Sequence, residues 1–109
     1  MASDHREEVK NTMDELLLSI PGVSGGKAFG YPAYKVGRKV FCFVGGDGIA
    51  IKLPPDRVQA LISNANMSIF EPNEGTQWQS WLSIDLKDPN AYADHRGLYE
   101  ESVQFVGEG

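Results

Sequence analysis

The sequence contains few of the residues from which metal and redox sites are built. It has one cysteine, so no disulfide can form within the chain, and its two histidines, His5 and His95, lie far apart. A structural zinc ion takes a full set of cysteine and histidine ligands, so we expect no metal site. A lone cysteine also fits a reducing compartment, and the location we expect is the cytoplasm.

The motifs of common catalytic and cofactor sites are scarce as well. The segment 22–28, GVSGGKA, resembles a phosphate-binding loop, but it is one residue short between its glycines and lacks a Ser or Thr after Lys27. Cys42 lies between Phe41 and Phe43, with no histidine near it in sequence to stabilise a thiolate. An inert, buried thiol is the expected state. The sequence therefore predicts a protein that is not an enzyme and carries no cofactor.

The chain also lacks a long apolar run and an excess of positive charge. No stretch approaches the roughly 20 apolar residues that a membrane-spanning helix needs, so no membrane association is expected. The N-terminal sequence MASDHREE is polar and acidic, unlike a signal or transit peptide. With 10 basic and 15 acidic residues, the net charge is −5. This balance disfavours a nucleic-acid partner, because that affinity depends largely on neutralised phosphates.

The clearest positive signal is the segment from Lys27 to Ala60, whose pattern predicts three strands and then a helix. Residues 33–36 and 40–44 flank Gly37-Arg38, which is expected to be a two-residue hairpin turn. The glycine-rich turn 45–48 leads to a third strand at 49–53, where alternate residues are apolar. Pro54-Pro55 ends that strand and opens a helix. The apolar residues of this helix recur at helical spacing and are Val58, Leu61, Ile62 and Ala65.

The segment before residue 27 adds a first helix. Its apolar stripe consists of Val9, Met13, Leu16, Leu17 and Ile20. Pro21-Gly22 is expected to end this helix. Residues 22–26 are expected to form a loop, and residues 27–30 a short strand or a lead-in to one.

The segment after residue 66 adds two strands and a last helical region. Residues 67–70 and 78–86 are the expected strands, with a turn at 71–75 between them. Asp88-Pro89 supplies an N-cap and a first-turn proline for the helical region, which Gly97 interrupts. We therefore predict one α+β domain, residues 1–109, with an antiparallel sheet backed by helices in the order α-β-β-β-α-β-β-α.

A family resemblance accompanies this pattern. The stretch FGYPAYKVGRKVFCFVGGDGIAIKLPPDRVQAL resembles the MmcQ/YjbR-like superfamily, which includes the N-terminal domain of TfoX-type competence regulators. The matching parts are Gly30 to Ala33, Lys39 to Phe41, Ile51 to Pro55, and Glu100 to Val103, where Val103 replaces the usual tyrosine. The resemblance implies a secretion-chaperone-like α+β fold, often bacterial and cytoplasmic. It implies no catalytic residues, although nucleic-acid binding has been suggested for the family and TfoX members regulate transcription.

The cations gather in the expected sheet. From Lys27 to Arg57 there are six basic and two acidic residues, a net charge of +4, so the rest of the chain carries −9. With regular hairpins, Tyr34 would lie opposite Phe41, and Phe41 opposite Lys52. The candidate binding residues on or beside one sheet face are then Tyr34, Arg38, Lys39, Phe41 and Lys52, together with Phe43. The aliphatic residues expected on the other face are Ala33, Cys42, Val44, Ile49 and Ile51.

This aromatic and basic face has two interpretations. It can lie beneath the chain's own helices, with lysine stems packed along the rings, or it can be a contact surface. A contact surface of this composition suits a protein partner, including a second copy of the chain. It also suits single-stranded nucleic acid stacked on the rings. We favour a regulatory or interaction domain that binds protein, with a nucleic-acid-binding or transcription-related module as the alternative.

Overall fold

The computed structural model describes residues 5–46 and 48–108, except for the side chain of Glu108. In these residues, six antiparallel strands form one sheet, and three α-helices and one 3₁₀ helix accompany it in an α+β arrangement. The elements in chain order are α1 (Glu7–Leu17), β1 (Val23–Ala28), β2 (Tyr31–Val36), β3 (Lys39–Gly45), β4 (Gly48–Lys52), α2 (Pro55–Leu61), β5 (Met67–Asn73), β6 (Thr76–Ile84), the 3₁₀ helix η1 (Pro89–His95) and α3 (Arg96–Glu108).

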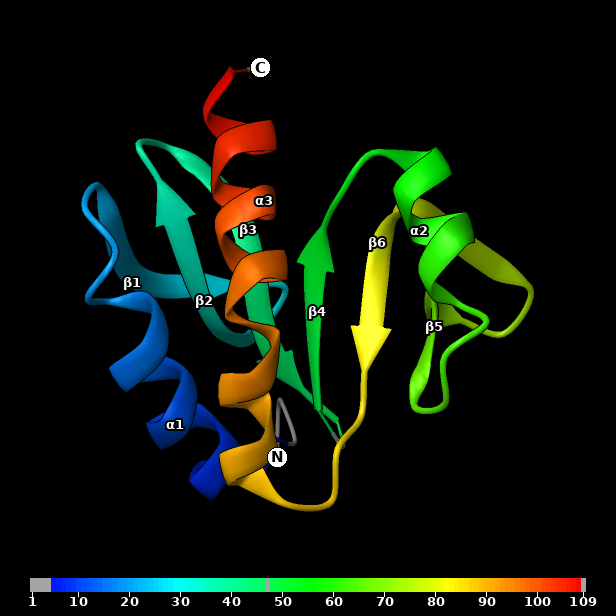
Figure 1. Cartoon of the computed structure of the whole chain (residues 1–109), viewed down its shortest axis with the longest axis horizontal. Coiled ribbons are helices and arrows are strands. Elements are labelled where there is room, and N and C mark those ends of the chain that lie inside the picture. The colour runs from blue at the N-terminus through cyan, green and yellow to red at the C-terminus, as the bar shows by residue number, and fades with distance from the viewer. Residues whose placement is uncertain (1–4, 47, 109) are drawn as a thin grey trace.

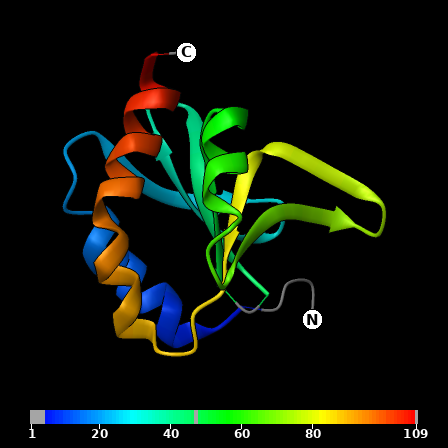
Figure 2. The ribbon, with the colours of Figure 1, turned by 45° about the vertical axis from the view of Figure 1, so that its right-hand side comes forward.

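The three α-helices lie on the same side of the sheet (Figures 1 and 2). The strands are ordered β1-β2-β3-β4-β6-β5, so β4 and β6 are neighbours although α2 and β5 separate them in sequence. Helix α3 crosses β2, β3 and β4, whereas α2 packs on β6 and β5, and α1 packs beside η1. The β5–β6 hairpin projects away from α1 and α3 (Figure 2). One face of the sheet is therefore covered by helices, and the other is not.

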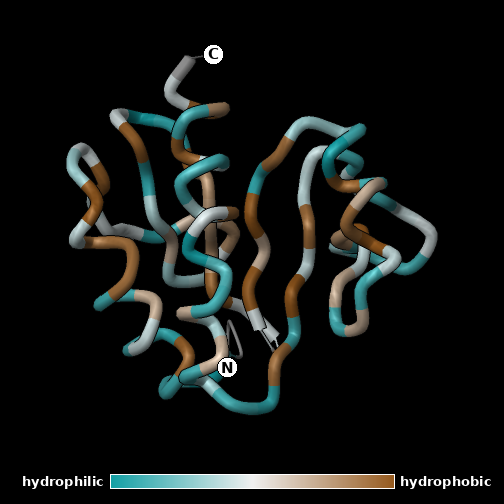
Figure 3. Tube along the Cα trace, in the orientation of Figure 1, coloured by the Kyte–Doolittle hydropathy of each residue, from teal (hydrophilic) through white to brown (hydrophobic). Residues whose placement is uncertain are grey.

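The main core lies between the helices and the sheet. Apolar residues recur along β4 and β6 (Figure 3), and those that join this core are Ile49, Ile51, Leu82 and Ile84. The most deeply buried large side chains of this core are Tyr34, Phe41, Ile49, Ile51, Leu53, Leu82, Ile84, Met13, Leu17, Tyr92 and Tyr99. Complete burial of such a side chain contributes about 1.5–3 kcal/mol, so this core dominates stability. No helix in the described part of the chain is long and apolar enough to cross a membrane.

The edge strand β1 corrects the expectation of a loop at residues 22–26. Val23–Ala28 pairs antiparallel with β2, with Gly25 opposite Tyr34 and Gly26 opposite Ala33. Glycine weakens a strand, but the middle residues of β1 are exposed at the sheet edge, where no apolar alternation is required. The order of elements is thus α-β-β-β-β-α-β-β-α, one strand more than predicted.

A β-bulge in β3 corrects the predicted register of the β2–β3 hairpin. Near the Gly37-Arg38 turn the register is as predicted, with Lys35 opposite Val40. Beyond the bulge, Tyr34 lies opposite Cys42 instead of Phe41. An extra residue in one strand turns every later side chain to the other face.

The bulge also corrects the predicted membership of the two faces. Tyr34 and Phe41 belong to the helix-covered core, where they join Cys42. Phe43 and Ala33, expected on opposite faces, lie together on the helix-free face. The second hairpin keeps its predicted register, so the error comes from the single bulge.

The C-terminal region largely follows the predicted pattern. The Asp88 side chain accepts a hydrogen bond from the amide of Asn90 at 3.0 Å and caps η1. The helical region consists of two pieces, as predicted, but the junction lies before Arg96, and Gly97 is the second residue of α3. Strands β5 and β6 extend further toward each other than predicted, which shortens the turn between them to residues 74–75.

Candidate functional site

The five predicted binding residues do not form one group. Tyr34 and Phe41 are buried beneath the helices, with 2% and 0% of their surface exposed. Arg38 is exposed in the β2–β3 turn, Lys39 is exposed at the start of β3, and Lys52 is half-buried at the end of β4. Lys39 and Lys52 line a common hollow, whereas Tyr34, Arg38 and Phe41 do not line it.

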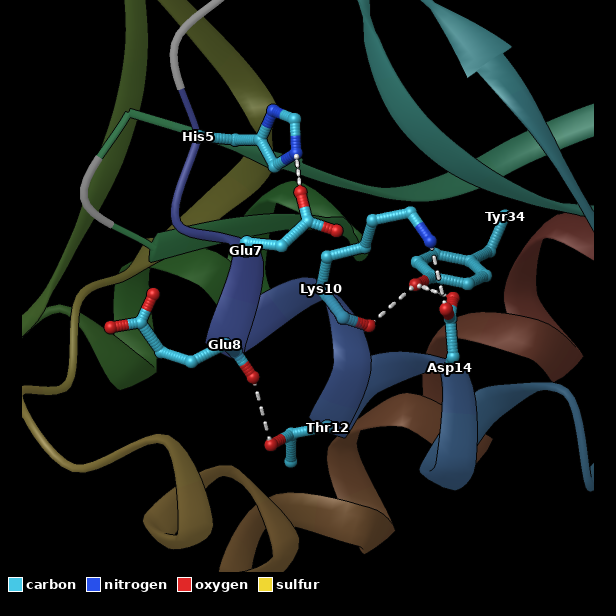
Figure 4. Close-up of polar contacts among 7 residues, drawn as sticks. All are labelled: His5, Glu7, Glu8, Lys10, Thr12, Asp14 and Tyr34. Atoms are coloured by element: carbon cyan, nitrogen blue, oxygen red, sulfur yellow. Dashed lines mark hydrogen bonds and ion pairs between the residues drawn. The ribbon is translucent and has the colours of Figure 1, made fainter.

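Tyr34 instead belongs to a polar cluster that joins β2 to α1 (Figure 4). Its hydroxyl donates to Asp14 Oδ1 at 2.6 Å, and Lys10 Nζ lies 2.8 Å from Asp14 Oδ2. Burial, followed by the bond to Asp14, raises the pKa of Tyr34. The hydrogen bond to Asp14 likewise raises the pKa of Lys10. A catalytic base or nucleophile needs the opposite shift, so this arrangement suits fastening α1 to the sheet.

The remaining polar contacts of Figure 4 are local to α1. His5 Nε2 lies 3.2 Å from Glu7 Oε1, and the Thr12 hydroxyl donates to the Glu8 carbonyl oxygen at 3.1 Å. Cys42 is completely buried, as predicted, and burial raises the pKa of its thiol. Within residues 5–46 and 48–108, no three His, Cys, Asp or Glu side chains are grouped so that they could hold a metal ion.

The segment Gly22–Gly26 also matches the Gly-x-Ser-x-Gly pattern of a nucleophile elbow, which our sequence reasoning overlooked. In an elbow the serine lies on a sharp turn from a strand into a helix. Here Ser24 lies within the edge strand β1, exposed and opposite Lys35. His5 contacts Glu7 and His95 ends η1, and among the described residues no hydrogen bond joins Ser24 to either histidine.

The helix-free face carries a group of aromatic rings, which we call the aromatic surface. Its members are Phe29, Tyr31, Phe43, Phe70, Trp78 and Trp81. Phe43 lies at the centre, with ring centroids 5.3 Å from Phe29, 5.2 Å from Phe70 and 5.3 Å from Trp81. Within the described part of the chain, the buried cluster beneath this surface consists of strand residues. The rings bury one another, so the sheet has a second, smaller core on the side away from its helices.

Phe29 is the most unusual member of the aromatic surface. It is 58% exposed and lies in the two-residue β1–β2 turn, where its φ is 58° and that of Gly30 is 83°. A turn with two positive φ angles favours Asn-Gly, because an L-residue with a bulky side chain is strained there. The Phe29 ring nevertheless reaches Trp78 of β6, with 5.3 Å between the centroids. An exposed aromatic residue thus occupies a turn position whose positive φ favours asparagine.

One end of the aromatic surface is hollowed, and we call this region the lysine hollow. Its volume is about 540 Å³, and its lining includes Phe29, Lys39, Lys52, Trp78, Trp81 and Phe105. Lys52 Nζ lies 5.9 Å from the centroid of the Trp81 ring, within cation–π distance. Neither Lys39 nor Lys52 forms an ion pair with any residue that the structure describes. The hollow thus combines an aromatic wall with two unneutralised cations.

The C-terminal Glu-Glu-Ser stretch supports this end of the sheet from behind. The Ser102 side chain is buried, and its hydroxyl lies 2.6 Å from the Lys52 carbonyl oxygen and 3.3 Å from that of Phe41. A single hydroxyl proton is shared between these two acceptors. Glu101 Oε2 lies 2.8 Å from Arg57 Nε of α2. These contacts fix the ends of β3 and β4, from which Lys39 and Lys52 project.

Sequence reasoning missed most of the aromatic surface. Trp78 and Trp81 are three residues apart, which in a regular strand would place them on opposite faces. The pairing of β5 with β6 is irregular here, because Ile69 lies opposite Leu82 while the next residue, Phe70, lies opposite Trp78. No alternation in the sequence signals this shift. The one available signal was the Phe29-Gly30 turn, where a large apolar residue precedes the glycine.

Comparisons with known proteins give no relative for this chain. Neither the family models, nor the curated proteins, nor the solved structures yield a match.

Proposed function

We propose that this chain is a non-catalytic interaction domain of the MmcQ/YjbR-like kind that binds another protein through the aromatic surface, with a second copy of the chain as the partner. The observation that carries the proposal is that Phe29 is exposed and held at a positive φ. A non-glycine residue held at positive φ is strained by about 1–2 kcal/mol. Its ring is more than half exposed, so folding recovers only part of that energy. Strain of this kind is often retained where a side chain serves binding.

The composition of the surface also favours a protein partner. Aromatic residues are enriched in the buried centres of protein interfaces, and charged residues lie at their rims. Here Phe29, Tyr31 and Trp78 keep exposed surface around the buried Phe43, and Lys39 and Lys52 lie at one end. Among the described residues, four of the eight ring contacts are edge to face, as for Phe29 on Trp78, three are tilted and one is stacked.

The non-catalytic part of the proposal depends on the buried reactive groups. Cys42 is inaccessible and its thiol pKa is raised by burial. The pKa values of Tyr34 and Lys10 are raised as well, further from the neutral range. These directions oppose nucleophilic or general-base chemistry at neutral pH.

Sedimentation velocity over a wide concentration range tests the proposal. We expect the wild type to show a monomer–dimer equilibrium and Phe29→Asn to shift it to monomer. Asparagine accepts positive φ, so this variant removes the ring without straining the turn. The matched control is Leu18→Asn, because among the described residues Leu18 is the other large apolar residue that is strongly exposed, at 46%, and it directly follows α1. A wild type that stays monomeric throughout, or equal effects of the two substitutions, would contradict self-association through this surface.

A nucleic-acid-binding function remains the second candidate because of the cations near Trp81. Lys52 lies over that ring, Lys39 lines the same hollow, and the exposed Arg38 precedes Lys39 in sequence. If oligonucleotides bind here, the affinity should fall steeply with salt, because each phosphate contact releases counterions. The single substitutions Lys39→Ala, Lys52→Ala and Arg38→Ala should then each weaken binding and reduce the salt slope by about one unit or less. We expect no measurable binding at physiological salt, because the rest of the chain carries the acidic excess.

A further inference from the structure

The lysine hollow has the size and lining of a small-molecule site. Its volume of about 540 Å³ falls within the range of roughly 300–1,000 Å³ typical of ligand pockets. Its wall is mainly apolar and comes from two sources, the sheet with Trp78 and Trp81, and helix α3 with Phe105. No carboxylate lines it in the part of the chain that the structure describes.

The charges at the hollow are not balanced. Lys39 is exposed at the start of β3, and Lys52 is half-buried at the end of β4, held over the Trp81 ring. Arg57 pairs with Glu101, and Lys10 pairs with Asp14, so these two cations have carboxylate partners. Among the described residues, the two lysines of the hollow have none. A ligand that complements this site carries a negative charge at one end and an apolar body at the other.

We propose that the lysine hollow binds a small amphipathic carboxylate. The carboxylate group lies at Lys39 and Lys52, and the apolar body lies between Phe29, Trp78 and Phe105. The proposal goes beyond the protein-binding function, because it concerns a free small molecule bound to the monomer and does not require a protein partner.

Tryptophan fluorescence gives a local readout for this site. The chain contains two tryptophans, and both line the hollow. The probes are phenylbutyrate and its uncharged analogue phenylbutyramide, each titrated into the wild-type protein at a concentration at which sedimentation shows a monomer. We expect phenylbutyrate to change the fluorescence saturably and phenylbutyramide to bind about tenfold more weakly. Added salt should weaken the binding of phenylbutyrate and leave the binding of phenylbutyramide unaffected, because salt screens the lysine charges. NMR shifts of the two indole N–H groups provide a second readout.

Charge-removing variants localise the effect. Lys39→Met and Lys52→Met should each reduce the affinity for phenylbutyrate by about tenfold and leave the affinity for phenylbutyramide unchanged. Lys87→Met is the matched control, because it removes the same charge from an exposed lysine that lies outside the hollow. Its binding should equal that of the wild type. Lys39 is exposed, so Lys39→Met tests the site even if Lys52→Met disturbs the Trp81 ring.

Three outcomes overturn the proposal. The first is saturable binding with equal affinities for phenylbutyrate and phenylbutyramide, since the lysine charges would then contribute nothing. The second is an equal loss of affinity in Lys87→Met, which would indicate a general charge effect. The third is tighter binding of a peptide, because an acidic protein segment also carries a carboxylate next to apolar groups. If an N-acetyl-Phe-Glu-amide dipeptide binds more tightly than phenylbutyrate, the hollow belongs to the protein-binding surface and the assignment to a free small molecule is wrong.

Discussion

The two faces of the sheet are stabilised in different ways. Beneath the helices, aliphatic and aromatic side chains from both the helices and the strands are almost completely buried, among them Phe41 at 0% exposure. On the helix-free face, Phe43 and Trp81 are buried by neighbouring rings and by small aliphatic residues of the same sheet. The first face depends on helices that come from both ends of the chain. The second depends on neighbouring strands alone.

This difference separates a surface that holds the fold together from one that is available to a partner. A change on the helix-covered face must leave a cavity or an unpaired polar group, because nothing can move in to fill the space. A change at the margin of the helix-free face meets solvent. We therefore expect substitutions on the helix-covered face to reduce stability more, and substitutions on the helix-free face to reduce partner binding more.

Phe41→Ala should have the largest effect on stability. The side chain is fully buried in the main core, so its truncation should lower the free energy of unfolding by about 3–5 kcal/mol. Phe29→Ala, the same change on the other face, should lower it much less because the ring is largely exposed. Urea unfolding followed by circular dichroism compares the two. Similar losses in the two variants would contradict the distinction between the faces.

The comparison also shows what periodicity can and cannot predict. The strands of the segment 33–53, the proline joint before α2 and the Asp88 cap were predicted, because turn residues and local alternation carry their own signals. Cys42 was predicted to be buried because it lies in the middle of an apolar strand. Its chemical inertness stays a prediction, which a thiol reagent under native conditions can test.

The candidate surface was predicted poorly because it depends on two irregularities of pairing. The bulge at Phe41 moves Tyr34 and Phe41 into the core. The shift between β5 and β6 brings Trp78 onto the same face as Trp81. Neither event has a local sequence signal, since both arise from how neighbouring strands fit together. Lys52 was placed correctly on the sheet face opposite the core because the second hairpin is regular.

Ser102→Ala should have the next largest effect. The substitution leaves the carbonyl oxygens of Lys52 and Phe41 without their hydroxyl donor in a buried site, which should cost about 1–3 kcal/mol. Ser63→Ala is the control, because the exposed Ser63 hydroxyl makes only a 3.4 Å bond to a nearby carbonyl oxygen. Thermal unfolding of both variants measures the difference. Equal stabilities would show that the Ser102 bond does not hold the ends of β3 and β4.

Tyr34→Phe should have a smaller effect, with a characteristic pH dependence. It removes the hydrogen bond to Asp14, which keeps its partner Lys10, so we expect a loss of about 1 kcal/mol at neutral pH. Burial raises the pKa of Tyr34 in the folded state, whereas an unfolded tyrosine ionises near about pH 10. Above that pH the unfolded state loses a proton that the folded state keeps, so stability falls as pH rises.

The control for this prediction is the pH dependence of stability, compared between the variant and the wild type. The Tyr34→Phe variant should lose stability less steeply above about pH 10 than the wild type, by up to about 1.4 kcal/mol per pH unit. Burial also raises the pKa values of Tyr92 and Tyr99, so part of the alkaline loss should remain in the variant. Urea unfolding at a series of pH values measures both slopes. Identical slopes for variant and wild type would contradict the assignment to Tyr34.

The smallest effect on stability is expected at Phe29, and there the order of two variants is informative. Phe29→Ala loses the ring contacts with Phe43 and Trp78 and keeps a Cβ at positive φ, so strain remains. Phe29→Asn loses the same contacts but relieves the turn, because asparagine tolerates this conformation. We expect Phe29→Asn to lie within about 1 kcal/mol of the wild type and to be more stable than Phe29→Ala. If the alanine variant were the more stable of the two, the backbone would not be strained at Phe29, and the argument that this ring is retained for binding would lose its basis.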